Sequence, residues 1–128
     1  MRVLLIDDSR TMRNIQKNVL KTLGEMDYSE AGDGCEALTI LAGNPPPFDI
    51  MLVDWNMPNM DGLTFVKRLR EKDKTTPVIM VTTEAEKTRV IDALRAGVNN
   101  YVIKPFTPDA LLDRVKTTME KCGRPVEA

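Results

Sequence analysis

The sequence predicts an α/β fold in which helices cover both faces of an open, five-stranded parallel sheet. Three unbroken apolar runs, at residues 3–6, 50–53 and 78–81, indicate strands that are buried on both faces. Segments with helical spacing of apolar residues separate these runs, and such alternation produces parallel strands joined by right-handed crossovers. With 128 residues, the chain has the length of one domain.

Charge and composition narrow the classes of function. The 18 basic and 19 acidic residues nearly balance, so we expect no nucleic-acid partner. The first apolar run is too short for a signal peptide, and no stretch approaches the roughly 20 apolar residues of a membrane span. Cys35 and Cys122 lack metal-ligand spacing and the chain has no histidine, which favours reduced thiols. We therefore expect a cytoplasmic domain without membrane contact.

The first half of the chain is predicted to form three strands and two helices. A helix lies between the strand at residues 2–6 and Gly24, which stops it. Residues 26–31 alternate and are more polar, as is typical of an edge strand. A turn at residues 32–34 and a short second helix lead to the central strand at residues 50–53. The apolar residues expected on the inner faces are Met12, Ile15, Val19, Leu23, Ala37, Leu38 and Leu41, and the first helix has three possible caps, Asp8, Ser9 and Thr11.

The second half continues the alternation. Turn residues at 58–62 precede a third helix, and the strand at 78–81 precedes a fourth helix that ends at Gly97. The last strand covers residues 101–103, and Thr107 caps the fifth helix. Pro108 takes the first helical position, and Gly123 and Pro125 end the helix. The apolar faces comprise Leu63, Phe65, Val66 and Leu69, then Val90, Ile91 and Leu94, then Leu112, Val115 and Met119, with Cys122 as a possible continuation.

Polar residues follow four of the predicted strands, at the point where each strand ends. They are Asp7 and Asp8, Asp54, Thr82 and Lys104. Because the carboxyl ends of parallel strands meet at one edge of a sheet, these side chains are expected to converge there. Asp54 alone could equally cap a turn. Three carboxylates, a hydroxyl and an ammonium at four inner strand ends are poorly explained by capping.

The residue types indicate metal-assisted phosphoryl transfer. Clustered carboxylates repel one another unless a cation relieves them. Oxygen ligands without histidine favour a hard divalent cation, and Mg²⁺ fits because it takes one or two carboxylates and leaves room for phosphate oxygens. A carboxylate such as Asp54 beside Mg²⁺ can attack phosphorus and form an acyl phosphate. Mg²⁺, Lys104 and the Thr82 hydroxyl would then neutralise the equatorial oxygens.

These residues resemble those of response-regulator receiver domains, and the resemblance covers nearly the whole chain. Each piece that carries it is weak alone, but five pieces in the family's order are specific. The pieces are Ile6-Asp7-Asp8, Val53-Asp54 with Met57-Pro58, Asp61-Gly62, Val81-Thr82-Thr83 and residues 101–106. Residues 9–13, 54–58 and 83–87 resemble more closely the chemotaxis members of the family. The resemblance implies a flavodoxin-like (βα)5 fold with strand order 2-1-3-4-5.

The resemblance also implies the chemistry of the site. Asp54 would accept a phosphoryl group from a phosphohistidine of a sensor histidine kinase. Asp8 and Asp54 would bind Mg²⁺ directly together with the backbone carbonyl of Asn56, and Asp7 would act through a coordinated water. The peptide bond between Lys104 and Pro105 would be cis, which costs only about 0.5–1 kcal/mol before proline. The domain would span residues 1–122, with a short tail at 123–128.

Output would depend on Thr82 and Tyr101. Thr82 would move to bond the phosphoryl group, and Tyr101 would turn into the vacated space. Without the resemblance, Tyr101 would be interpreted as a half-buried strand aromatic. The partner-binding surface that these movements change would include Ala85, Val90, Leu94, Val98, Tyr101 and Arg114. The output surface would shift between two packing arrangements, and phosphorylation would favour one of them.

The resemblance further predicts partners and tuning residues. Asn56 and Glu84 would flank the site and set how fast water attacks the acyl phosphate. Thr83 occupies a position where receivers often have Ala or Gly, so its bulk would narrow access. We expect a monomer that binds a histidine kinase, an output protein such as the flagellar motor switch, and a phosphatase.

Two other classes share parts of the pattern. Haloacid-dehalogenase-type enzymes form an aspartyl phosphate, but they carry Asp-x-Asp after the first strand and need a cap or a longer chain. Here Asp7 and Asp8 are adjacent, and the candidate nucleophile follows a later strand. In a flavodoxin-like electron carrier, three carboxylates would repel the flavin phosphate. Within the receiver class, a receiver of another phosphorelay, or one from a multidomain regulator, remains the alternative to chemotaxis.

Overall fold

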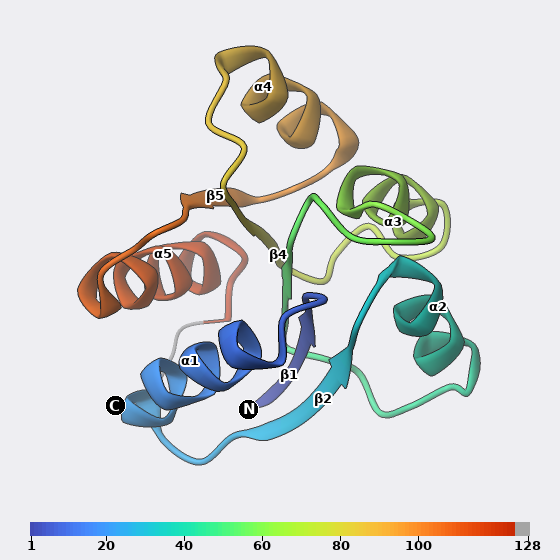
Figure 1. Ribbon diagram of the computed structural model, residues 1–128. Coiled ribbons are helices and arrows are strands. Elements are labelled where there is room, and N and C mark those ends of the chain that lie inside the picture. The colour runs from blue at the N-terminus through green and yellow to red at the C-terminus, as the bar shows by residue number, and fades with distance from the viewer. Residues whose placement is uncertain (125–128) are drawn as a thin grey trace.

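The computed structural model describes residues 1–124, in which five strands alternate with five α-helices (Figure 1). All strand pairs are parallel, and the sheet order is β2-β1-β3-β4-β5, so the predicted flavodoxin-like fold is confirmed. The elements are β1 (Arg2–Ile6), α1 (Arg10–Leu20), β2 (Asp27–Ala31), α2 (Gly34–Ala42), β3 (Ile50–Val53), α3 (Gly62–Arg70), β4 (Val78–Thr82), α4 (Lys87–Ala96), β5 (Asn100–Ile103) and α5 (Pro108–Lys121). A short 3₁₀ helix at Lys21–Leu23 follows α1.

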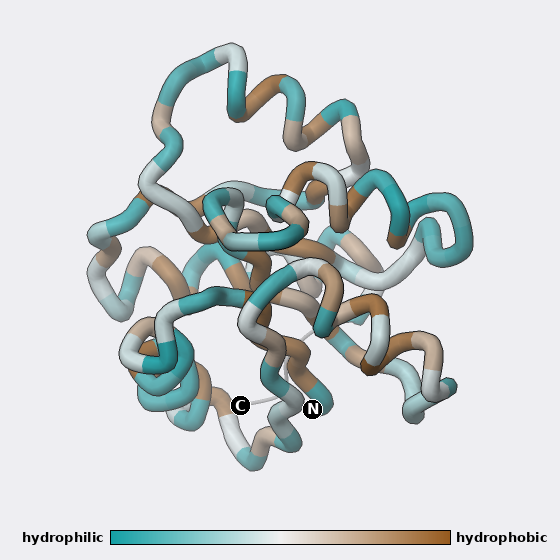
Figure 2. The backbone as a smooth tube through the Cα atoms, turned by 45° about the vertical axis from the view of Figure 1, so that its right-hand side comes forward, coloured by the Kyte–Doolittle hydropathy of each residue, from teal (hydrophilic) through white to brown (hydrophobic). Residues whose placement is uncertain are grey.

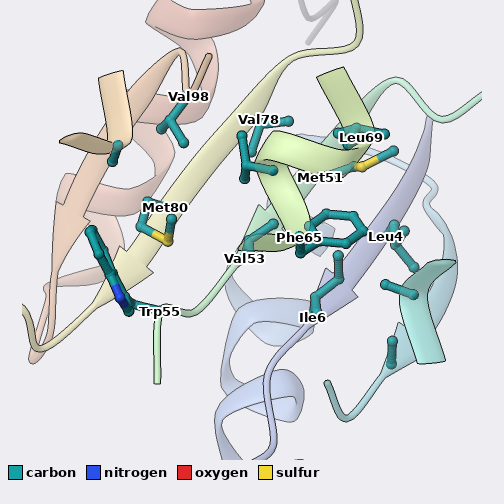
Figure 3. Close-up of a cluster of buried hydrophobic side chains, with 14 of the residues drawn as sticks. Leu4, Ile6, Met51, Val53, Trp55, Phe65, Leu69, Val78, Met80 and Val98 are labelled. Atoms are coloured by element: carbon teal, nitrogen blue, oxygen red, sulfur yellow. The ribbon is translucent and has the colours of Figure 1, made fainter. Parts of the chain in front are cut away.

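The unbroken apolar runs serve two separate cores. Alternate residues of a strand point to opposite faces, so Leu4 and Ile6 face one helical layer while Val3 and Leu5 face the other. The first core also contains Phe65, Met51, Val53, Val78 and Met80 (Figure 3). The second core contains Ile50, Leu52, Ile79, Val81 and Val102.

The helices divide between the two faces. Helices α2, α3 and α4 cover the first core, whereas α1 and α5 pack together over the second (Figure 1). Of the three possible caps of α1, the structure selects Ser9, whose side chain accepts a hydrogen bond from the Met12 amide. Thr107 caps α5 as predicted. None of the helices in residues 1–124 is long and apolar enough to cross a membrane.

Two helices present different faces from those predicted. In α1 the buried residues are Gln16, Val19 and Leu20, while Ile15 is 42% exposed. The helix is rotated about its axis relative to the prediction, so that Gln16, Val19 and Leu20 face the sheet. The polar residue Gln16 therefore lies on the buried face, where apolar residues are expected. In α4 the buried residue is Ala93, and Leu94 is 49% exposed.

The exposed apolar residues of α4 follow from its place in the fold. This helix lies at the margin of the molecule and packs mainly against α3 (Figure 1). Only one narrow stripe of α4 can then be covered, and the small residue Ala93 fills it. Figure 2 shows hydrophobic segments along α4, the uppermost helix. Ile91, at 36% exposure, belongs to this uncovered set.

Candidate functional site

The strand register brings the predicted polar residues to one edge of the sheet. Ile6 pairs with Val53, so the residues after them, Asp7 and Asp54, are neighbours. The Asp54 amide donates to the Ile6 carbonyl at 2.9 Å, which extends the ladder one residue beyond β3. On the other side, the Lys104 amide donates to the Thr82 carbonyl at 2.9 Å.

A lysine bridges two buried carboxylates at this edge. The Lys104 ammonium lies 2.7 Å from Asp7 Oδ2 and 3.2 Å from Asp54 Oδ2. Asp7 and Asp54 are only 1% and 8% exposed. Burial alone would lower the pKa of Lys104, but its hydrogen bond to Asp7 and the charges of Asp54 and Asp7 outweigh burial and raise the pKa above the ordinary value. Lys104 is therefore a cation at neutral pH, and its peptide bond to Pro105 is cis, as expected.

The acidic residues fit a divalent metal ion. One carboxylate oxygen from each of Asp7, Asp8 and Asp54 lies within 4.8 Å of the others. Three carboxylates beside the one ammonium of Lys104 leave an excess of two negative charges. Asp8 is exposed, so the cluster is open to solvent on one side. An all-oxygen set that is open to water suits Mg²⁺, which keeps several waters.

Thr82 does not bond Asp54 in this structure. Its hydroxyl oxygen accepts a hydrogen bond from the Glu84 amide at 3.3 Å. The alternation along the strands explains this arrangement. Thr82 has the same parity as Met80, which faces α3 and α4, whereas Asp54 has the parity of Leu52, which faces α1 and α5.

The chain after Asp54 packs closely against the start of α3. The Gly62 amide donates to the Trp55 carbonyl at 2.8 Å. A Cβ atom on Gly62 would lie 2.0 Å from the carbonyl oxygen of Asp54, far inside van der Waals contact. The Asp61-Gly62 pair of the family pattern is thereby explained, since Asp61 caps α3 and glycine permits the close approach.

The loop between β4 and α4 is held from two sides. The Asn56 amide group donates to Glu84 Oε1 at 2.9 Å, which connects the residue that follows Trp55 with this loop. The Tyr101 hydroxyl donates to the Glu84 carbonyl at 2.6 Å from β5. Glu84 therefore connects Asn56, the other predicted tuning residue, with Tyr101, whose half-buried ring packs against the first core.

The hydroxyl of Tyr101 should lose its proton only at unusually high pH. Burial, with the negative charges of Glu84 and Asp54, raises its pKa to about 12, against the opposing effect of Arg89. Below the ordinary value of 10.0, folded and unfolded chains both keep the proton. Between there and about 12 only the folded chain keeps it, so the free energy of unfolding falls as the pH rises.

Alkaline absorbance titration of tyrosinate checks this expectation. The chain has two tyrosines, and both Tyr28 and Tyr101 have raised pKa values. We expect the last tyrosine step to disappear in Tyr101→Phe and to persist in Tyr28→Phe. An unchanged last step in Tyr101→Phe would contradict the burial and hydrogen bond described here.

The residues of the predicted output surface divide into two groups. Ala85, Leu94 and Arg114 are exposed, and Val90 and Tyr101 are partly buried. Val98 is only 4% exposed and packs in the first core with Ala93, so its placement on the surface was wrong. It follows Gly97, where the chain turns inward from α4 towards β5.

Sequence reasoning missed two arginines near the site. The Arg89 guanidinium lies over the ring of Trp55, 5.2 Å from its centroid, and so contacts the residue after Asp54. Arg13 donates from Nη1 to the main-chain carbonyl of Asp7. When a strand ends in acidic residues and a helix follows, a basic residue in the first turn of that helix could indicate a contact with the site. Such residues also occur on solvated helix faces, so the pattern alone does not distinguish the two.

Residues 3–116 match the family of response regulator receiver domains, and the chain belongs to that family. The fold and the acidic site thus define a signalling receiver of two-component systems.

Within the family, the chain is a CheY-like receiver. It is 48% identical over 121 residues to a chemotaxis protein CheY homolog of Campylobacter jejuni, covering 93% of this chain and 92% of the relative. Chemotaxis protein CheY4 of Vibrio cholerae has a TM-score of 0.82 at 34% identity, covering 91% and 97% of the two chains. A chain of a CheX–CheY complex of Borrelia burgdorferi with BeF3 and Mg²⁺ has a TM-score of 0.85 at 30% identity, covering 91% and 87%.

Proposed function

We propose that Asp54 accepts a phosphoryl group from a phosphohistidine on a histidine kinase. The observation that carries this proposal is the convergence of three carboxylates and one ammonium at the carboxyl edge of the sheet. A carboxylate oxygen of Asp54 forms a bond to phosphorus while the bond from phosphorus to the imidazole nitrogen breaks. The electron pair of that bond stays on the imidazole.

The surrounding residues supply positioning and charge. Lys104, already 3.2 Å from Asp54 Oδ2, neutralises charge on the transferred group. The Thr82 hydroxyl turns from the Glu84 amide towards the same group. Asp8, Asp54 and the Asn56 backbone carbonyl bind Mg²⁺, with Asp7 acting through water. Bound Mg²⁺ neutralises negative charge on the phosphoryl oxygens, and its presence with BeF3 in the Borrelia complex supports this metal.

Asn56 and Glu84 set the rate of hydrolysis in this proposal, and the domain promotes its own phosphorylation and dephosphorylation. Their hydrogen bond at 2.9 Å joins the two loops beside Asp54, where an attacking water would enter. The Borrelia complex supports a CheX-like protein as a phosphatase partner. The proposed domain covers residues 1–122, and residues 125–128 of the proposed tail lie outside the described residues.

Phosphorylation alters the surface formed by α4, β5 and α5. Movement of Thr82 breaks the hydrogen bond that its hydroxyl accepts from the Glu84 amide. The carbonyl of Glu84 also accepts a hydrogen bond from Tyr101, so the change reaches Tyr101. The exposed apolar residues Ile91 and Leu94 on α4 and Ile103 on β5 offer a partner a surface to cover. Similarity to chemotaxis proteins supports the flagellar motor switch as that partner.

The Tyr101→Ala variant tests the output half of this proposal. We expect it to take up phosphoryl from acetyl phosphate like the wild type, because the Tyr101 hydroxyl bonds the Glu84 carbonyl rather than Asp54. Its phosphorylated form should bind the purified flagellar switch component at least about tenfold more weakly in titration calorimetry, about 1.4 kcal/mol.

Tyr28→Ala provides the matched control, since Tyr28 lies on β2 at the opposite edge of the sheet. This control should retain partner affinity. Equal affinity in the wild type and Tyr101→Ala would remove Tyr101 from the output path. Binding by neither protein, with phosphorylation intact, would favour a receiver of another phosphorelay.

A further inference from the structure

Arg13 lies beside the acidic cluster although it contacts no carboxylate of the cluster directly. It occupies the first turn of α1, and its amide donates to the carbonyl of the cap residue Ser9 at 3.0 Å. Its side chain is 15% exposed, so it is largely enclosed. From there Nη1 donates to the main-chain carbonyl of Asp7.

That contact completes the set of hydrogen bonds that fix Asp7. The Asp7 amide donates to the Ala31 carbonyl at 3.0 Å, and Oδ1 accepts from the Ser9 amide at 2.9 Å. Oδ2 accepts from Lys104 at 2.7 Å. The carbonyl bonded by Arg13 belongs to the planar peptide that joins Asp7 to Asp8, so its direction determines where Asp8 begins.

Arg13 is itself held in place by an ion pair. Its Nε lies 3.0 Å from Glu30 Oε1, at the end of β2. The other oxygen of Glu30 lies 2.6 Å from the Lys17 ammonium, one turn further along α1. The guanidinium therefore uses two donors at once, one on Glu30 and one on the Asp7 carbonyl, a fork that lysine cannot reproduce.

We propose that Arg13 is a positioning residue that orients the Asp7–Asp8 peptide for metal binding, and that Glu30 holds Arg13 in this role. The inference rests on the proposed Mg²⁺ site. Residues that orient metal ligands without touching the metal typically contribute about 10–100-fold to affinity. The guanidinium charge acts in the opposite sense, because a cation near the site repels Mg²⁺. Its pairing with Glu30 reduces that repulsion, so orientation dominates.

The test measures Mg²⁺ affinity by titration calorimetry, without any phosphodonor. Arg13→Met removes the donors and the charge while keeping similar bulk, and we expect Mg²⁺ to bind at least about tenfold more weakly. Lys17→Met is the matched control, because it removes an equal charge and another partner of Glu30 without touching Asp7. This control should bind Mg²⁺ as well as the wild type, or slightly more tightly.

Further variants separate orientation from charge. Arg13→Lys keeps the repelling charge but cannot form both hydrogen bonds, so it should bind Mg²⁺ at least as weakly as Arg13→Met. Glu30→Gln leaves Arg13 in place but loosens it, and should also weaken binding; it provides the readout if Arg13→Met does not fold. Wild-type affinity or tighter binding in Arg13→Met would overturn the role of Arg13 while leaving the metal site intact. Absence of Mg²⁺ binding by the wild type would overturn the metal site and this inference together.

Discussion

Asp54→Asn should abolish phosphoryl uptake from acetyl phosphate. The amide has nearly the same shape as the carboxylate, but it lacks the negative charge and the nucleophilic oxygen that attack phosphorus. Intact-protein mass spectrometry in the presence of Mg²⁺ should show a phosphorylated species for the wild type and none for the variant. Trp55 fluorescence should likewise stop responding to the donor.

Asp61→Asn is the appropriate control for this experiment. Asp61 lies on the same loop, where its side chain accepts from the Thr64 amide at 2.8 Å to cap α3. Asparagine is an equally good cap, so fold and phosphoryl uptake should both persist. Uptake that persists in Asp54→Asn would assign the acceptor to another residue.

The largest expected effect on stability comes from Gly62→Ala. The new Cβ would lie 2.0 Å from the Asp54 carbonyl oxygen and 3.1 Å from Trp55 Cα, both of them backbone atoms. Neither atom can move without displacing the end of β3. We expect the free energy of unfolding to fall by about 3 kcal/mol or more in urea denaturation, at the upper end of overpacking costs.

Gly43→Ala shows what the same substitution does where space exists. A Cβ there would meet only the Ile40 carbonyl oxygen, at 3.4 Å, and the backbone φ of −76° suits any residue. We expect a change within about 1 kcal/mol, with a gain in stability if the loss of unfolded-state freedom dominates. Wild-type stability in Gly62→Ala would contradict the close approach at Asp54.

The strands and the site edge were predictable because they depend on chemistry that local sequence records. Ile50 to Val53 reads as an unbroken apolar run since both faces of β3 are covered, and the run ends at Asp54, at the carboxyl edge of the sheet. Parallel topology then determines which strand ends are neighbours. For this reason Lys104, 97 residues after Asp7, could be expected at the same edge before its distances were known.

The buried face of α1, the burial of Val98 and the contact of Arg13 depend on packing, which the local sequence does not record. The rotation of α1, which buries Gln16 and exposes Ile15, is set by its contacts with the sheet and α5. Val98 reads as a surface residue until the turn at Gly97 is known to send it inward. The contact between Arg13 and the Asp7 carbonyl involves a main-chain atom, so no pairing of residue types reveals it.

The most direct test of the proposed phosphoacceptor site uses Trp55. It is the only tryptophan, it is 3% exposed, and it follows Asp54 directly beneath Arg89. Fluorescence is followed while Mg²⁺ and then acetyl phosphate are added to the wild type and to Asp54→Asn. The proposal predicts a change on adding Mg²⁺, followed by a second change on adding the donor that is lost in the variant. A wild-type protein that responds to neither addition would contradict it.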